Sequence, residues 1–345
     1  MQQACTWVTF IGARTVAETM KAIVQGAYGQ PDVLRFAEVE RPRVGDKGVL
    51  VRVVSASIHK GDWHLLTGKP YLLRVAGFGV FKPNNPIPGM AIAGRIEAVG
   101  RNVVAFRVGD EVFGEIKGGG FAEYASVRAD ELAPKPPGVG FEDAAALPIS
   151  ATTALQGLRD AGRLTSGQSV LVYGSSGGVG TFAVQIAKAL GVHVTGVCSA
   201  RNVEMVRSIG ADRVIDYEKE DFTEGSHRFD VVFDLVGNRP LTAFRRVLAE
   251  RGRLVACAGG ADREWLGPMV PVLAGLVSNL ISRQTFAPLV AMPNKQDLLT
   301  VAGWVEAGKL RPVIDRRCTL EEVPEALRYV GLGHSRGKVV VNLMV

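Results

Sequence analysis

The sequence predicts an α/β protein with two parts, a β-rich, barrel-like domain and an open parallel sheet covered by helices. Three observations carry this prediction. The chain has 345 residues, enough for two domains of ordinary size. Its N-terminal part consists of short β-branched runs separated by glycines. From residue 169 onward, strand and helix patterns alternate at regular intervals, as they do in parallel sheets.

The β-rich part begins at residues 20–24, which have the pattern of a first strand. Four more segments combine β-branched residues with glycine, as is typical of strongly curved sheets. They are 48–54, 91–100, 108–114 and 118–127. We expect the last strand, 337–341, to return to this domain. Residues 1–19 lack the pattern of a signal peptide, and we assign no role to this extension.

The second part alternates between strands and helices. An alanine- and leucine-rich helix is predicted over 144–158. Strands are predicted at 169–173, 192–197, 213–215, 231–235 and 253–258, and helices at 179–190, 202–209 and 240–248. A helical pattern returns at 295–307. In the last predicted helix, 319–329, Thr319 and Glu322 have the spacing of a capping box.

A glycine-rich turn joins the first strand of the predicted sheet to the next helix. Residues 174–180 have the form GxxGxxG. Small residues stand where a Cβ would block a close approach, and the N–H groups and dipole of the helix start suit a pyrophosphate. We therefore predict a dinucleotide site at Gly174, Ser175, Ser176, Gly177, Gly178 and Val179. The alternative is a tight turn between strand and helix that binds nothing.

The end of the second strand distinguishes the two nicotinamide cofactors. NAD sites usually have Asp or Glu here, which binds the ribose 2′-hydroxyl. Residues 197–202 contain no carboxylate. Ser199 supplies a hydroxyl and Arg201 a cationic fork that suits a 2′-phosphate, so the sequence favours NADP (NADPH). The alternative is that Arg201 is only a solvated residue at the start of a helix.

Composition argues against several other classes of protein. The net charge is +6, and the longest basic clusters are pairs without interleaved aromatic residues, which argues against nucleic-acid binding. The most apolar stretch, 266–281, is too short for a membrane span and contains two prolines. The four cysteines are scattered and form no CxxC pair, which fits a reducing compartment. We expect a cytoplasmic protein.

Over nearly all of residues 20–345, the chain resembles the medium-chain dehydrogenase/reductase superfamily, and within it the zinc-independent quinone oxidoreductase branch. The matching stretches are 109–114, 173–191, 208–217, 229–234 and 337–341. From residue 278 onward it is most similar to chloroplast-type and mitochondrial quinone or enone reductases. The resemblance implies a GroES-like catalytic domain over 20–143 and 290–345. It also implies a Rossmann NADP-binding domain over 144–289, with the active site between the two.

Metal ligands of the zinc-containing relatives are missing from this sequence. His59 stands at the position of their cysteine, and Gly89-Met90-Ala91 replaces their Gly-His-Glu, so one potential ligand remains where three are needed. The four-cysteine lobe that binds structural zinc is absent too. We therefore expect no metal.

The expected chemistry follows from the lack of a Lewis acid. An unactivated alcohol is hard to oxidise without a metal, whereas an electron-poor C=C bond or a quinone needs a hydride and a stabilised oxyanion. We expect an NADPH-dependent reductase of quinones or α,β-unsaturated carbonyl compounds. Two alternatives stay open. One is a reductase of other activated alkenes, such as an alkenal or an enoyl thioester. The other is a low-turnover NADPH-binding sensor or structural protein.

The resemblance places His59, Lys60 and Asp62 where the substrate cleft meets the nicotinamide. Relatives often have Asn-Pro at the positions of His59 and Lys60, and Asp at that of Ala91. His59 or Lys60 could hydrogen-bond a developing oxyanion or relay a proton. The alternative is that these residues are structural or lie at the rim.

The resemblance also implies further cofactor contacts. Thr153 is expected near the nicotinamide, Ser199 and Tyr217 near the adenosine phosphate, and Val236 and Gly259 beside the ribose and nicotinamide. Lys338 is an additional candidate. The segment from Ser278 to Phe286 matches an edge strand that pairs across a two-fold axis. Because an exposed edge needs cover, we expect a homodimer through this strand.

Overall fold

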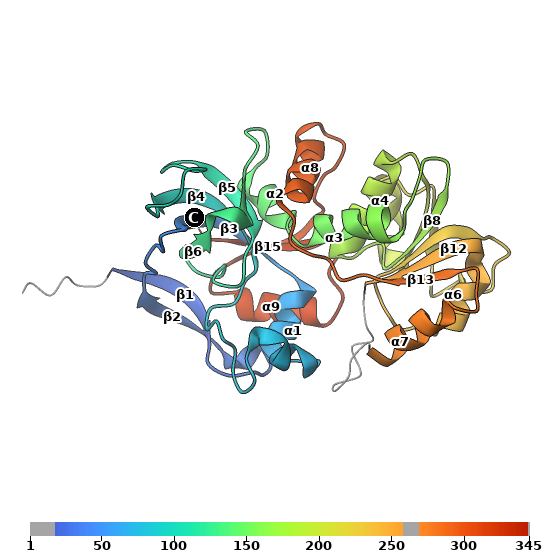
Figure 1. The fold of residues 1–345 in the computed structure, drawn as a ribbon, viewed down its shortest axis with the longest axis horizontal. Helices are drawn as coiled ribbons and strands as arrows, with labels where there is room; N and C mark the ends of the chain where they lie inside the picture. The colour runs from blue at the N-terminus through green and yellow to red at the C-terminus, as the bar shows by residue number, and fades with distance from the viewer. Residues whose placement is uncertain (1–17, 258–268, 344–345) are drawn as a thin grey trace, which may run out of the picture.

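Two large sheets organise the protein, and each forms one of the two lobes in Figure 1. The computed structural model describes residues 18–257 and 269–343. The β-rich sheet lies in one lobe, and the parallel sheet with its helices lies in the other. The predicted fold class is confirmed. The predicted domain boundaries stay our proposal.

The β-rich lobe contains a seven-stranded sheet. Its order is β14 (Ile314–Thr319), β15 (Lys338–Asn342), β3 (Gly48–Ile58), β4 (Ala91–Val99), β5 (Glu111–Glu115) and β7 (Leu132–Pro134), and β6 (Tyr124–Arg128) pairs with β3. The pairing of β15 with β3 is antiparallel, so the C-terminal segment completes this sheet. A Cβ on Gly94 would lie 2.2 Å from the Arg52 carbonyl oxygen, which explains a glycine inside β4. A separate antiparallel pair joins β1 (Thr19–Gln25) to β2 (Leu34–Glu40). We predicted β1 from the sequence but not β2.

The second lobe contains a six-stranded parallel sheet. Its order is β10 (Arg213–Asp216), β9 (His193–Cys198), β8 (Ser169–Tyr173), β11 (Phe229–Asp234), β12 (Leu248–Ala256) and β13 (Thr285–Pro288). β9 and β10 lie on one side of β8, and β11 to β13 lie on the other. The strand order therefore reverses at β8, and the carboxyl end of β8 is a topological switch point. The predicted strand 253–258 begins earlier, at Leu248, because α6 (Leu241–Val247) passes directly into it.

Helices cover both faces of the parallel sheet because its strands alternate their apolar side chains. Val170 and Val172 pack in one core cluster with α3 (Ser150–Gln156) and α4 (Gly178–Ala189). Leu171 and Tyr173 face the opposite cluster, which includes residues of α6. On α4, the side chains from Phe182 to Val184 and of Ile186 are fully buried, so this helix is fixed in place at the end of β8.

The helix predicted over 144–158 is interrupted. It consists of α2 (Phe141–Ala146), α3 and the short π-helix η4 (Gly157–Ala161). Pro148 has no N–H to donate, so it interrupts the hydrogen-bond ladder of a continuous helix. Ile149 then adopts a φ of 65°, which is rare for a β-branched residue. As a result, Ser150 stands at the start of a new helix.

The predicted edge strand from Ser278 to Phe286 is wrong in its position. Ser278 is the last residue of α7 (Met269–Ser278), and the strand begins only at Thr285. The Asn279 side chain explains the turn between them, because it donates to the Phe286 carbonyl (3.0 Å) and accepts from the Phe286 N–H (2.7 Å). These bonds cover the backbone of β13 at Phe286.

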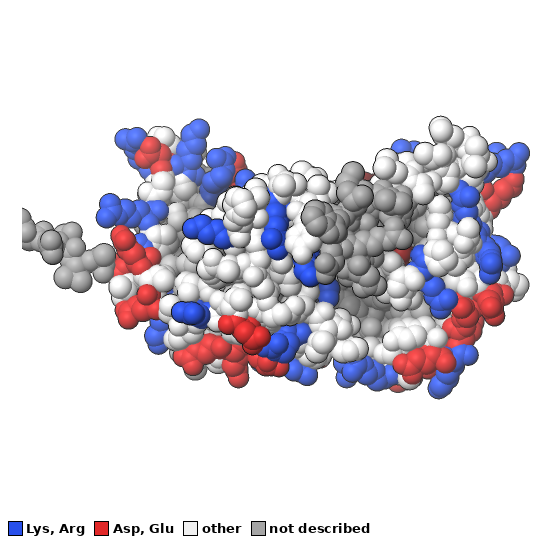
Figure 2. Space-filling view, turned by 90° about the horizontal axis from the view of Figure 1, so that it is seen from below, with Lys and Arg blue, Asp and Glu red and all other residues white. Residues whose placement is uncertain are grey.

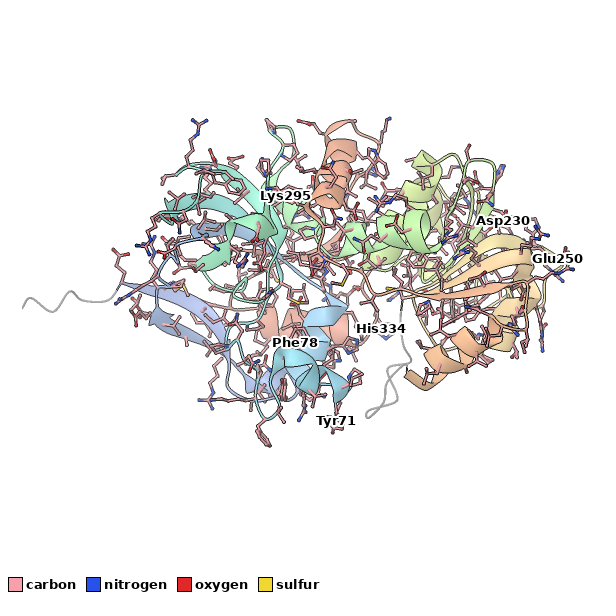
Figure 3. The ribbon with its side chains drawn as sticks, viewed as in Figure 1. Tyr71, Phe78, Asp230, Glu250, Lys295 and His334 are labelled. Carbon is pink, nitrogen blue, oxygen red and sulfur yellow. The ribbon has the colours of Figure 1, made fainter. Side chains whose placement is uncertain are left out.

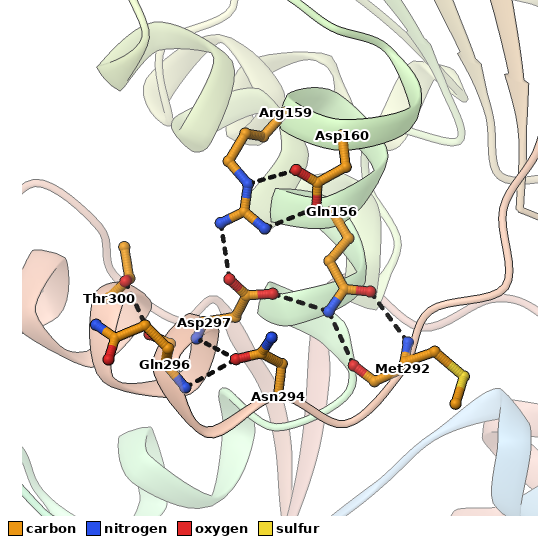
Figure 4. A network of polar contacts seen from close by, with 8 residues as sticks. All are labelled: Gln156, Arg159, Asp160, Met292, Asn294, Gln296, Asp297 and Thr300. Atoms are coloured by element: carbon orange, nitrogen blue, oxygen red, sulfur yellow. Dashed lines mark hydrogen bonds and ion pairs between the residues drawn. The ribbon is translucent and has the colours of Figure 1, made fainter.

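A polar network fastens α8 (Lys295–Glu306) to α3 and η4 (Figure 4). Asn294 caps α8 by accepting from the N–H groups of Gln296 and Asp297. The buried Asp297 carboxylate accepts from Arg159 (2.7 Å) and from the Gln156 amide (2.9 Å). The segment that returns to the β-rich lobe is therefore anchored on the helix that begins at Ser150.

Charged side chains of both signs are mixed around the rim of the face in Figure 2. Within 18–257 and 269–343, no helix has both the length and the apolar character that a membrane crossing requires.

Candidate active site

The glycine turn leaves the start of α4 open to a ligand. The N-cap residue of α4 is Gly177, which has no side chain to bind the first N–H groups of the helix. Gly174 adopts a φ of 91°. A Cβ on Gly180 would lie 2.1 Å from the Gly174 carbonyl oxygen, so only glycine fits there. These features fit the pyrophosphate of a dinucleotide, which would be held by the N–H groups of Gly178 and Val179.

The two serines of the turn have different surroundings. The Ser175 hydroxyl is fully buried and donates to the Val197 carbonyl (3.0 Å), so it fixes the turn against β9. Ser176 lies within reach of the adjacent strand end, where the Asn202 amide donates to the hydroxyls of both Ser176 and Ser199 (3.1 Å each). Asn202 therefore clips the turn to the end of β9. The sequence analysis missed Asn202, although its position, three residues after Ser199 in a carboxylate-free segment, was a signal.

Three of the remaining predicted cofactor residues, Arg201, Tyr217 and Val236, follow the carboxyl ends of strands of the parallel sheet. Arg201 is exposed and donates to the His334 carbonyl (2.9 Å), and Figure 3 places His334 between the two lobes. Tyr217 and Val236, which follow β10 and β11, are 47% and 39% exposed. Thr153 is buried within α3. Gly259 lies outside the described residues.

A buried polar cluster forms where β15, β3 and α3 meet. The Lys338 ammonium group donates to His59 Nδ1 (3.0 Å), to the Ser150 hydroxyl (3.2 Å) and to the Ile58 carbonyl (3.3 Å). The Ser57 hydroxyl lies 3.0 Å from His59 Nε2 and donates to the Ala145 carbonyl (2.6 Å). None of these four side chains is more than 5% exposed. We refer to Ser57, His59, Ser150 and Lys338 as the lysine cluster.

Burial controls the charges in the lysine cluster. It lowers the pKa of Lys338 to about 7, although the nearby Asp62 carboxylate acts in the opposite direction. Burial, assisted by the positive charge of Lys338, also lowers the pKa of His59 well below its usual range. His59 is therefore neutral at pH 7, with one nitrogen protonated.

Asp62 and Lys60 do not join the lysine cluster by hydrogen bonds. The Asp62 carboxylate accepts from the His59 backbone N–H (2.8 Å) at the start of α1 (Lys60–Thr67). Burial raises the pKa of Asp62 to about 7. Lys60 points the other way and donates to the Gly331 carbonyl (2.6 Å) at the end of α9 (Val323–Gly331). Lys338, which we had expected beside the cofactor, is the lysine that contacts His59.

The glycine turn and the lysine cluster touch at Gly178. A Cβ on Gly178 would lie 3.5 Å from Lys338 Cδ and 3.6 Å from the Ser150 hydroxyl oxygen. A ligand on the N–H groups of α4 would thus lie against Ser150 and the stem of Lys338. The sequence analysis overlooked Ser57 and Ser150, because nothing local relates them to Lys338. A lysine directly before three valines in a predicted strand was the available signal.

Comparisons with known proteins identify the family of this chain. Family models for an alcohol dehydrogenase GroES-like domain and for a zinc-binding dehydrogenase match residues 45–137 and 209–341. A 2-methylene-furan-3-one reductase from Solanum lycopersicum is 33% identical, over 95% of this chain and 80% of its own length. A chloroplastic NADPH-dependent alkenal/one oxidoreductase from Arabidopsis thaliana is 30% identical, over 99% of this chain and 84% of its own.

The chain belongs to the medium-chain dehydrogenase/reductase family. Its similarity to the solved quinone oxidoreductase from Coxiella burnetii, with a TM-score of 0.83 and 27% identity over 95% of this chain and all of that one, places it in the quinone oxidoreductase branch. The predicted resemblance and the two-part GroES-like and Rossmann fold are confirmed.

One of the matching family models is described as zinc-binding. In the part of the chain that the structure describes, no group of three or more His, Cys, Asp or Glu residues could hold a metal ion. At the position where zinc-containing members of the family have cysteine, His59 contacts Lys338 and Ser57 instead. The absence of a metal requirement stays a prediction.

Proposed function

We propose that this member of the family uses NADPH, without zinc, to reduce quinones or α,β-unsaturated carbonyl compounds. The observation that carries the proposal is the contact between the start of α4 and the lysine cluster. It puts the Lys338 side chain and the Ser150 hydroxyl beside the site that fits a dinucleotide. The names of two relatives, an alkenal/one oxidoreductase and a 2-methylene-furan-3-one reductase, support this substrate class.

The choice of NADPH over NADH rests on the end of β9. No carboxylate follows this strand between Cys198 and Asn202, so nothing there repels a 2′-phosphate. The Ser176 and Ser199 hydroxyls meet at Asn202, and the exposed Arg201 guanidinium lies next to them in the chain. An Arg fork and two hydroxyls are suitable donors for a phosphate.

The cofactor and the protein have different roles in the proposed reduction. When bound, NADPH supplies the hydride. The protein aligns the acceptor and stabilises the negative charge that develops on its oxygen. The lysine cluster provides that stabilisation, because it holds a buried cation with hydrogen-bonded hydroxyls at the seam between the two lobes.

The direct test is the loss of NADPH absorbance with a panel of quinones, enones, alkenals and enoyl thioesters. We expect oxidation with quinones or enones, and less with NADH. Activity confined to alkenals or enoyl thioesters would favour reduction of another activated alkene. NADPH binding without oxidation by any acceptor would contradict the proposal and favour a sensor or structural role.

We also propose a homodimer, formed through apolar residues beside β13. Leu280 and Ile281 are 84% and 86% exposed, whereas Asn279 already covers the strand at Phe286. Hydrophobic burial is therefore better supported than extension of the sheet. The cytoplasmic location stays a prediction, since one relative is named chloroplastic.

Light scattering on the Ile281→Asp variant tests the dimer. A charge buried in an apolar interface is unfavourable, so we expect the wild type at the dimer mass and Ile281→Asp at the monomer mass. Val104, which is 99% exposed in the β-rich lobe, gives the control variant Val104→Asp, which should remain dimeric. A wild type at the monomer mass would contradict the proposal.

A further inference from the structure

Both nitrogens of the His59 ring are already used inside the lysine cluster. The Lys338 ammonium group can only donate, so Nδ1, at 3.0 Å, accepts its proton. The Ser57 hydroxyl donates its single proton to the Ala145 carbonyl (2.6 Å), so it accepts from Nε2–H at 3.0 Å. Lys338 Nζ also lies 3.3 Å from Nε2, but its shorter contact is with Nδ1, so we place the proton of the neutral ring on Nε2, toward Ser57. His59 has no donor left for a substrate.

Ser150 is in a different position within the cluster. Its hydroxyl oxygen accepts from Lys338 at 3.2 Å. The only acceptor in reach of its own proton among the described contacts is His59 Nδ1, at 3.3 Å, whose lone pair already receives the shorter bond from Lys338. The break at Pro148 and Ile149 starts α3 at Ser150 and brings its oxygen to 3.6 Å from the Cβ position of Gly178. Ser150 therefore has a proton to give, and it faces the start of α4.

Resting on the proposed function, we propose that Ser150 is the catalytic residue that protonates the reduced acceptor and that Lys338 replaces its proton. His59 and Ser57 are positioning residues, which hold the Lys338 ammonium group against Ser150. This assignment differs from the one drawn from the sequence, where His59, Lys60 and Asp62 were the candidates.

The acceptor gains two electrons and a hydrogen nucleus as hydride from the reduced nicotinamide, which leaves a negative charge on its oxygen. The Ser150 O–H bond breaks as the O–H bond of the product forms. Ser150 takes a proton from Lys338 Nζ, and the neutral amine of Lys338 regains a proton from water after the product leaves. One acceptor, one hydride and one proton are consumed.

The charges around Lys338 make this transfer possible near neutral pH. Burial brings the pKa of Lys338 to about 7, so its ammonium group releases a proton far more readily than an exposed lysine does. The groups that face it are the neutral His59 ring and the buried Asp62 carboxyl, on which Glu115 acts in turn. Because the reactive form is protonated, we expect kcat to fall as the pH rises above the pKa of Lys338.

The deciding variant is Ser150→Ala, which removes one oxygen. We expect kcat to fall about 100-fold, the low end for loss of a general acid, while the Kd for NADPH stays within about 2-fold. Ser55→Ala is the matched control, because Ser55 is a buried serine of β3 that bonds to Asn342 outside the lysine cluster. It should keep wild-type kcat.

Lys338 and His59 act through Ser150, so their variants need a readout beyond rate. Lys338→Arg keeps a positive charge but releases no proton near neutral pH, so kcat should fall and its decline at high pH should disappear. Lys338→Met should do the same, and His59→Asn should shift the midpoint of the decline. Circular dichroism and NADPH titration establish that each variant is folded.

Three results would overturn the assignment. Wild-type kcat in Ser150→Ala would exclude Ser150 as the acid and leave the proposed function intact. A loss of NADPH affinity in Ser150→Ala as large as the loss of kcat/KM would make Ser150 a cofactor contact. A wild type that binds NADPH but oxidises it with none of the tested acceptors would overturn the proposed function itself.

Discussion

The glycine turn and the lysine cluster meet at Gly178, yet they are constructed in opposite ways. The turn offers backbone N–H groups and works because side chains are missing, as the 2.1 Å approach at Gly180 shows. The lysine cluster consists of side chains that satisfy one another almost completely in a buried space. The turn is one contiguous segment, whereas the cluster joins β3, α3 and β15.

This difference predicts which substitutions impair cofactor binding and which impair proton supply. A backbone site tolerates changes in neighbouring side chains but not an added Cβ. A side-chain site tolerates changes in its surroundings but not the loss of one partner, because the others are then buried without a hydrogen bond. Cofactor binding and proton supply should therefore respond to different substitutions.

The largest expected effect comes from Gly180→Ala. Its Cβ would lie 2.1 Å from the Gly174 carbonyl oxygen, so the turn must move away from α4. We expect the Kd for NADPH, measured by fluorescence titration, to rise at least about 100-fold. Gly303→Ala is the control, since nothing lies within 4 Å of the added Cβ on α8. Unchanged affinity for NADPH in Gly180→Ala would contradict cofactor binding at the glycine turn.

Asp62→Asn should change how stability depends on pH. Burial raises the pKa of Asp62 from 3.8 to about 7, so the folded state keeps a proton that the unfolded chain loses. The free energy of unfolding therefore falls as the pH rises from about 4 to about 7. Asparagine stays neutral and retains an acceptor for the His59 N–H. We expect its stability relative to wild type to increase by about 2–3 kcal/mol between pH 5 and pH 8.

Urea unfolding at both pH values measures this change. Asp130→Asn is the control, because Asp130 is exposed and its Arg128 partner lowers the pKa of its carboxyl. It should show no such gain. A pH-independent difference between wild type and Asp62→Asn would mean that Asp62 is ionised in the folded protein throughout.

Arg201→Ala tests the side-chain component of the cofactor site. We expect the KM for NADPH to rise about 10-fold relative to that for NADH, the contribution of one charge-assisted phosphate contact. The ratio isolates the phosphate, since loss of the bond to His334 affects both cofactors. Arg207→Ala removes an exposed arginine that pairs with Glu204, and it should leave the ratio unchanged. An unaltered ratio in Arg201→Ala would refute the role of Arg201.

The smallest effect is expected from Asn202→Ala. The variant leaves the Ser176 and Ser199 hydroxyls without their shared donor, so we expect a loss of about 1 kcal/mol in the free energy of unfolding and a few-fold weaker NADPH binding. Asn84→Ala, at an exposed asparagine, should cost less. Equal losses in the two variants would show that the clip between turn and strand is unimportant.

The contrast between a contiguous turn and a cluster from three separate elements also explains what could be predicted from the sequence. The turn and β8 were predicted correctly because their residues are adjacent in the chain and follow one period. The break at Pro148 was missed because the alanine-rich pattern continues through it, and the edge strand was misplaced because the bonds of Asn279 are not visible as a pattern. The lysine cluster was out of reach, since the pairing of β15 with β3, which joins Lys338 to His59, is a tertiary contact.

The antiparallel pairing of β15 with β3 also has a consequence for biosynthesis. On the ribosome, the entire parallel sheet is translated before residues 338–342 emerge. Until then β3 lacks one of its neighbours, and His59 lacks its lysine. A nascent chain can thus complete its nucleotide-binding half first, while the half that supplies the proton waits for the last strand to be made.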